Sequence, residues 1–160
     1  TGTIPLTRLT QNVTCSTTPP YPTSADFALS GNWYDPATSG QGLTVDVNPN
    51  SGTVFSAWYT YAPNGAGAGA VGQRWYTAQP ATFVPGARSI PVTIYETSGG
   101  AFDTPTDPAQ KTVSVGSGTL AFRSCSAATF GYSFTGGSSN GLSGIIALRR
   151  VGPVPKGCTS

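Results

Sequence analysis

The chain has 160 residues, a formal net charge of +2, no His and only 9% charged residues, against about a quarter in an average soluble domain. This composition excludes His-dependent catalysis and His-ligated metal sites, and it offers no basic stripe for a nucleic-acid partner. The longest apolar run, residues 145–148, is far too short for a transmembrane helix. The length suits one domain with extensions.

The N-terminal region, residues 1–23, is predicted to be a strand followed by a linker. Residues 1–10 alternate as a strand does, and residues 16–23 are polar and rich in Pro, which is typical of an extended spacer. We therefore expect this region to lie outside the main domain.

This first strand resembles the last strand of the chain. When residues 2–9 are aligned with residues 144–151, Ile4, Leu6 and Arg8 fall on an Ile, a Leu and an Arg. The match could simply reflect two similar β-strands built from the same few residue types. Alternatively, the first strand imitates the last one and occupies an equivalent slot on another subunit, or it is the remnant of a tandem repeat.

The main domain, residues 24–151, is predicted to be all β, with a short C-terminal arm at residues 152–160. Eight alternating runs with turn residues between them are expected as strands: residues 27–34, 42–47, 53–61, 72–78, 89–97, 111–123, 127–134 and 142–151. Short connections favour antiparallel pairing, and eight such strands favour an up-and-down barrel without exposed edges. A β-sandwich is the alternative.

Two of the predicted strands carry aromatic side chains on both faces. In residues 53–61, Tyr59 and Tyr61 alternate with Trp58, and the strand at residues 72–78 contains adjacent Trp75 and Tyr76. One aromatic set would fill the barrel, and the other would be exposed and available for contact with a ligand. The sequence leaves open which set is which, so all five are candidate binding residues.

The sequence lacks the residue combinations that common catalytic mechanisms require. The six carboxylates contain no evident facing pair, and Ser-based hydrolysis has no His as its base. Asp35 precedes Pro36, where an Asp usually initiates a turn. We expect a protein that is not an enzyme and that has neither cofactor nor metal.

Three cysteines leave one over after an internal bridge. A bridge between Cys125 and one of the terminal arms, through Cys15 or Cys158, is favoured, and a Cys15–Cys158 bridge is the alternative. The odd cysteine indicates an intermolecular disulfide or a buried thiol. Disulfides and a chain that starts at Thr1 without Met are what we expect of a secreted, extracellular protein whose signal peptide has been removed.

The segment from Leu29 to Gly42, Leu-Ser-Gly-Asn-Trp-Tyr-Asp-Pro-Ala-Thr-Ser-Gly-Gln-Gly, resembles the Gly-x-Trp signature of calycins, and of avidins most closely. The resemblance implies an eight-stranded antiparallel barrel in which a basic residue of the last strand packs over Trp33. Arg150 shares a face with the inward residues of that strand and is the candidate. The resemblance also places Asp35 and Ser39 near a ligand. The chain lacks the later Trp cluster of avidins, so biotin is not the expected ligand.

The chain also resembles a module of secreted bacterial proteins over most of its barrel. The shared pattern is the Gly-x-Trp-Tyr-Asp-Pro-x-x-Ser-Gly-x-Gly stretch, then Trp-Tyr-Thr-Tyr at residues 58–61, and then Trp-Tyr at residues 75–76. This resemblance implies compartment and fold rather than activity.

The function expected from these features is that of a structural subunit of an extracellular assembly, a fibre or sheath. Its N-terminal strand would join the subunits through Ile4, Leu6 and Arg8, so the main partner is the chain itself. The alternative is a secreted binding module for glycans or a small ligand.

Overall fold

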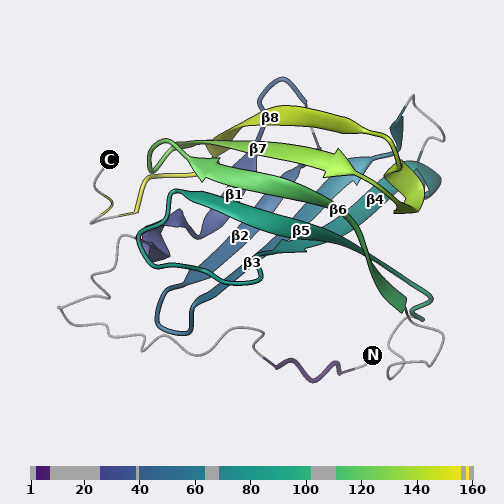
Figure 1. Cartoon of the computed structure of the whole chain (residues 1–160), viewed down its shortest axis with the longest axis horizontal. Coiled ribbons are helices and arrows are strands. Elements are labelled where there is room, and N and C mark those ends of the chain that lie inside the picture. The colour runs from purple at the N-terminus through teal and green to yellow at the C-terminus, as the bar shows by residue number, and fades with distance from the viewer. Residues whose placement is uncertain are drawn as a thin grey trace.

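The computed structural model describes residues 3–7, 26–38, 40–63, 69–101, 111–155 and 158. Eight strands follow one another around a closed antiparallel barrel (Figure 1). They are β1 (Gly31–Tyr34), β2 (Gly42–Asn48), β3 (Thr53–Tyr61), β4 (Gln73–Gln79), β5 (Ser89–Ser98), β6 (Lys111–Phe122), β7 (Ala127–Phe134) and β8 (Ser143–Arg150). The predicted barrel is confirmed, and the sandwich alternative is wrong.

Three short 3-10 helices accompany the strands in the described part of the chain: η1 (Phe27–Leu29), η3 (Gly69–Gly72) and η4 (Gly137–Ser139). None of its helices combines the length and the apolar character that crossing a membrane would demand.

The first strand was predicted at residues 27–34, and this prediction is wrong for its first half, because Phe27–Leu29 forms η1 instead. The N–H of Leu29 donates to the carbonyl of Asp26 at 3.0 Å, and that of Ser30 donates to the carbonyl of Phe27 at 3.1 Å. Ala28 and Leu29 are adjacent and both buried. A strand turns adjacent side chains to opposite faces, whereas a helical turn can bury both against the end of the barrel.

The barrel interior is filled by aromatic side chains from three strands. The Trp58 ring of β3 lies 5.1 to 5.7 Å, between centroids, from Tyr76 of β4 and from Phe130, Tyr132 and Phe134 of β7. Tilted and edge-to-face contacts at this spacing are favourable for aromatic rings. The interior is therefore a packed core at this level of the barrel.

Trp33 closes one end of the barrel. Its side chain is fully buried, its indole N–H donates to the carbonyl of Leu29 at 3.1 Å, and its ring meets that of Phe122 edge to face. The guanidinium carbon of Arg150 lies 4.5 Å from the Trp33 ring centroid. This is the contact that the calycin resemblance implies for these two residues.

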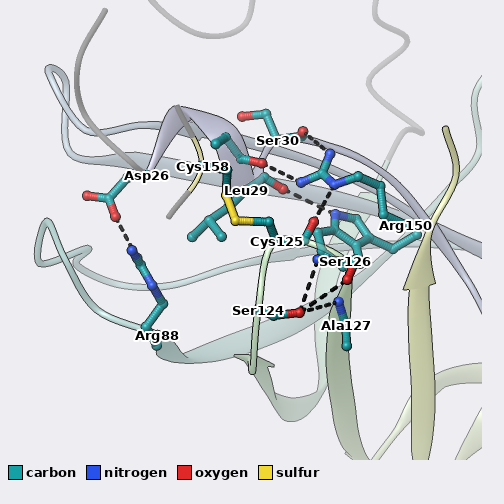
Figure 2. Close-up of a disulfide and its surroundings, with 12 residues drawn as sticks. Asp26, Leu29, Ser30, Arg88, Ser124, Cys125, Ser126, Ala127, Arg150 and Cys158 are labelled. Carbon is teal, nitrogen blue, oxygen red and sulfur yellow. Dashed lines mark hydrogen bonds and ion pairs between the residues drawn. A yellow bond between two sulfur atoms is a disulfide. The ribbon is translucent and has the colours of Figure 1, made fainter. Parts of the chain in front are cut away.

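The same guanidinium connects three segments of backbone (Figure 2). Arg150 donates from Nε to the carbonyl of Cys125 at 2.6 Å, from Nη1 to that of Ser30 at 2.9 Å, and from Nη2 to that of Ala28. Desolvation by burial lowers the pKa of the Arg150 guanidinium from its ordinary value. Arg150 thus joins the end of β8 to the start of the barrel and to the turn between β6 and β7.

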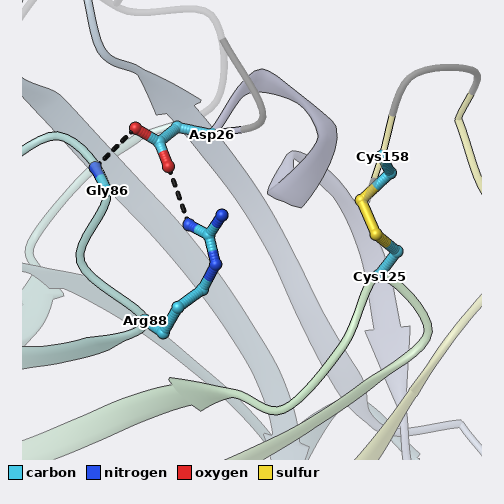
Figure 3. Close-up of polar contacts among 5 residues, drawn as sticks. All are labelled: Asp26, Gly86, Arg88, Cys125 and Cys158. Carbon is cyan, nitrogen blue, oxygen red and sulfur yellow. Dashed lines mark hydrogen bonds and ion pairs between the residues drawn. A yellow bond between two sulfur atoms is a disulfide. The ribbon is translucent and has the colours of Figure 1, made fainter. Parts of the chain in front are cut away.

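A salt bridge at the same end joins η1 to the connection between β4 and β5 (Figure 3). The buried carboxylate of Asp26 accepts from Arg88 Nη1 at 2.8 Å and from the backbone N–H of Gly86 at 2.8 Å. These contacts fix the position of η1 where the barrel begins.

Cys125 and Cys158 form a disulfide, with their Cα atoms 6.1 Å apart. The bridge therefore joins Cys125 to the C-terminal arm, one of the two pairings favoured from the sequence. Cys15 lies outside the described residues.

We expect the double variant Cys125→Ala/Cys158→Ala to lose about 3–4 kcal/mol of unfolding free energy, because the bridge closes a loop between residues 33 positions apart. Urea denaturation monitored by tryptophan fluorescence measures this loss. Cys15→Ser keeps the bridge and serves as the control. A double variant as stable as the wild type would show that the bridge adds nothing to the fold.

Candidate functional site

The first part of β8 has an incompletely paired strand edge. This strand pairs with β7 along its length, from Ser143 to Arg149. On its other side β8 pairs with β1 only at Arg149 and Arg150. Within the described residues, Ser143 to Leu148 therefore has no strand on that side. We call this stretch the β8 edge.

The β8 edge is free because β1 is short. β1 ends at Tyr34, and the following Asp35 begins a turn, in which its Oδ1 accepts from the N–H of Ala37 at 2.9 Å. This is the turn-initiating role expected for Asp35. The next strand, β2, begins only at Gly42. Neither β1 nor β2 therefore pairs with residues 143–148 of β8.

The direction of the backbone groups shows which of them are unpaired. The N–H of Arg150 donates toward β7, to the carbonyl of Ser126, whereas that of Val151 donates toward β1, to the carbonyl of Asn32. Backbone groups alternate in direction along a strand, so Ile145 and Ala147 direct their N–H and C=O groups to the free side. No partner for them on that side is found in the described part of the chain.

A cavity of about 280 Å³ with an apolar floor opens beside the β8 edge. Its floor consists of buried Leu43, Trp58 and Leu148, and Tyr132 and Ile146 contribute to its lining. The remaining lining residues lie around the mouth and are mostly polar: Asp35, Thr38, Gln41, Gly42, Thr60 and Ile145. Ile145 itself is 79% exposed. The cavity and the free strand edge form one continuous feature, which we call the β8 groove.

The described part of the predicted N-terminal strand, residues 3–7, does not form a strand in the single chain. Residues 3–7 carry no strand and are exposed, with Ile4 at 54% and Leu6 at 90% exposure. In Figure 1 this purple segment lies apart from the barrel. Among the described residues, no backbone hydrogen bond joins residues 3–7 to the barrel. The predicted assembly residue Arg8 lies outside the described residues.

The five aromatic binding candidates separate into two sets. Trp58 and Tyr76 are 4% and 1% exposed and belong to the core. Neither side chain therefore contributes to the outer surface, and Trp58 forms part of the floor of the β8 groove. Tyr59, Tyr61 and Trp75 have the opposite parity and lie on the outside of β3 and β4.

These three outward residues line a second depression of about 290 Å³ on the outer wall, together with Gly40, Thr60, Gln73 and Arg74. Tyr59 lies directly opposite Trp75, and Tyr61 lies opposite Gln73. We call this depression the outer groove. Of the two residues placed near a ligand by the avidin resemblance, Asp35 lines the β8 groove, and Ser39 lies outside the described residues.

Ile145 and Ala147 are the site residues that sequence reasoning missed. The Asp35-Pro36 dipeptide after so short a strand is the signal that could have indicated them, because it ends β1 before β8 is covered. For metals, the described residues contain no group of three or more His, Cys, Asp or Glu side chains placed to bind an ion.

An eight-stranded antiparallel barrel of this kind is compatible with a calycin-like fold. Comparison with known proteins gave no match for this chain among family models, curated proteins or solved structures. The two grooves and the exposed N-terminal segment are therefore the features that indicate a function.

Proposed function

We propose that this protein is a non-catalytic structural subunit of an extracellular homopolymer, in which residues 3–7 of one copy add as a strand to the β8 edge of the next. One observation carries the proposal. The same chain presents an exposed segment of alternating apolar residues and, elsewhere, a free strand edge beside a cavity with an apolar floor. Strand addition satisfies both, because main-chain hydrogen bonds supply affinity and alternate side chains fill pockets.

Pro5 favours a parallel arrangement of the added strand. In a parallel pair, a residue of the added strand that hydrogen-bonds to β8 lies beside a β8 residue whose own N–H and C=O groups point away from the added strand. The side chains of these two residues lie on the same face of the sheet. Leu6 can then bond to Ile145 and Ala147, lie beside Ile146 and direct its side chain into the cavity. Pro5, which has no N–H, turns its backbone away from β8.

The antiparallel alternative is less favourable for the same inward side chains. It would turn the backbone of Pro5 toward β8, where a missing N–H costs a ladder hydrogen bond. In the parallel register, Ile4 takes the next inward place, beside Gly144. The Tyr132 ring covers Gly144, with its hydroxyl 2.8 Å from where a Cβ of Gly144 would lie, so Ile4 would pack against that ring.

Both the backbone and the side chains of such a contact contribute favourable free energy to association. Each ladder hydrogen bond contributes about 0.5–1.5 kcal/mol, and burial of a Leu side chain contributes about 1.5–3 kcal/mol. Leu6 is 90% exposed in the free chain, so docking would transfer nearly all of its side-chain surface out of water. The formal net charge of only +2 keeps repulsion between copies small.

The third cysteine supports a durable contact. Cys125 and Cys158 are bonded to each other, which leaves Cys15, eight residues beyond the docking segment, for a disulfide between copies. The intrachain bridge itself supports an oxidising, extracellular location. We infer that the chain is a secreted bacterial barrel of the module type that its motifs resemble, with its own copies as partners and no nucleic acid or membrane insertion.

The test compares two double variants of the full chain by sedimentation velocity and negative-stain electron microscopy. Ile4→Asp/Leu6→Asp places charges on the face that enters the cavity, whereas the control Thr3→Asp/Thr7→Asp places equal charges on the opposite face. We expect wild type and control to form concentration-dependent assemblies and Ile4→Asp/Leu6→Asp to be a monomer with an unchanged melting temperature.

Two results would contradict the proposal. A wild-type chain that stays monomeric at every concentration shows that no homopolymer forms. Equal loss of assembly in both double variants shows that charge alone, rather than inward packing of Ile4 and Leu6, controls association.

A further inference from the structure

The outer groove presents aromatic rings that face solvent rather than the core. Trp75 is 60% exposed and Tyr61 is 48% exposed, and both lie beside Tyr59 on adjoining strands. The proposed assembly through the β8 groove does not use these side chains. Exposed aromatic side chains gathered on one surface indicate a contact with another molecule.

The two tyrosine rings are held in position by glycines of the preceding connection and strand. An added Cβ at Gly40 would lie 2.5 Å from the hydroxyl of Tyr61, and one at Gly42 would lie 3.0 Å from that of Tyr59. The Gly-x-Gly spacing thus matches the Tyr-x-Tyr spacing of β3. Rings that are fixed before a ligand arrives lose little side-chain freedom on binding.

The polar groups around the groove are suited to an uncharged ligand. Gln73 contributes an amide, and Thr60 and the tyrosines contribute hydroxyls. Arg74 is the one charged residue among the described lining residues, and its Nη1 already donates to the carbonyls of Val71 and Gln73, each at 2.9 Å. The groove therefore offers rings and neutral hydrogen-bonding groups, and its described lining residues include no carboxylate to attract a cation.

We propose that the outer groove binds a neutral polysaccharide by stacking sugar rings on Trp75, Tyr59 and Tyr61. A pyranose ring has an apolar C–H face and a rim of hydroxyls, which matches flat rings surrounded by amide and hydroxyl groups. The site lies on the outer wall of β3 and β4, so it is open to a long chain that extends beyond the groove. The proposal does not depend on self-assembly.

Tryptophan emission gives a direct readout, because two of the three tryptophans are buried. Trp33 is 0% and Trp58 is 4% exposed, so a ligand on the surface alters the emission of Trp75. The full chain is titrated separately with cellohexaose, xylohexaose, chitohexaose and maltohexaose. At least one of these four hexasaccharides is expected to produce a saturable change in emission.

Variants are then compared by isothermal titration calorimetry with the hexasaccharide that binds. Trp75→Ala and Tyr61→Ala are expected to weaken binding about tenfold or more, which corresponds to one lost stacking contact of about 1–1.5 kcal/mol. Val84→Ala, which removes another exposed apolar side chain, is the matched control and should bind like the wild type.

The proposal is overturned if none of the four hexasaccharides changes the emission of the wild type, or if Trp75→Ala binds as tightly as the wild type. Loss of self-association in Trp75→Ala without any glycan response would also overturn it, because the groove would then be a contact between copies.

Discussion

Replacing Arg150 with Leu is expected to lower the free energy of unfolding by about 2–3 kcal/mol, the loss typical when charged hydrogen bonds of a half-buried side chain are removed. The guanidinium donates to the carbonyls of Ala28, Ser30 and Cys125 and lies over the Trp33 ring. Without it, three carbonyls lose a charged donor, and the closure of β8 on β1 loses its side-chain support. Urea denaturation of the oxidised protein measures the change.

Arg149→Leu is the matched control for this measurement. Arg149 is the neighbouring residue on β8, but its side chain is exposed, so its replacement should change stability by no more than about 0.5 kcal/mol. Equal effects of the two substitutions would mean that the end of the barrel does not depend on the Arg150 contacts.

Trp58→Ala is expected to cost about 3–5 kcal/mol of unfolding free energy, as truncation of a buried large aromatic side chain does. Trp58 contacts four aromatic rings inside the barrel and contributes to the floor of the β8 groove. The vacated space would enlarge that cavity, so docking of Leu6 should weaken as well. Thermal and urea denaturation test the first effect, and sedimentation tests the second.

Trp75→Ala provides the comparison, because Trp75 lies on the adjacent strand but is 60% exposed. Its replacement should leave stability within about 0.5 kcal/mol of the wild type. If Trp58→Ala were equally harmless, Trp58 would be a ligand-contacting residue rather than part of the core.

The positions of the strands could be predicted from the sequence because turn residues bound them. The expected runs at residues 53–61 and 127–134 coincide with β3 and β7, and the others agree to within a few residues, apart from the first. Gly, Pro and Asn at the connections require backbone conformations that strands do not have. Local chemistry therefore determines most of the strand boundaries, whereas the start of β1 depends on the burial of Ala28 and Leu29 against the barrel.

The direction of the aromatic side chains could not be predicted, because both faces of β3 are aromatic. Alternation shows that Trp58 and Tyr59 point oppositely, but it does not show which of them points inward. The choice depends on the partners across the barrel, where Phe130 and Phe134 of β7 meet Trp58. That contact joins residues more than 70 positions apart in the chain.

The free β8 edge likewise depends on two distant segments. The closed barrel was expected from the sequence, but not that β1 would end at Tyr34 and cover only the final residues of β8. The N-terminal segment was expected to be a strand that pairs within the chain or with a neighbouring copy, and residues 3–7 form no strand in the single chain. A strand requires a partner, and the proposed partner lies on another copy.

The most direct test of the assembly is amide hydrogen exchange at single residues of β8. The wild-type chain is compared with Ile4→Asp/Leu6→Asp at one concentration at which the wild type assembles. We expect the amides of Ile145 and Ala147 to exchange about tenfold more slowly or better in the wild type, because a docked strand accepts their hydrogen bonds. The amide of Ile146, which faces β7 in both proteins, should exchange equally. Identical rates for Ile145 and Ala147 in the two proteins would contradict the docking of the N-terminal segment on β8.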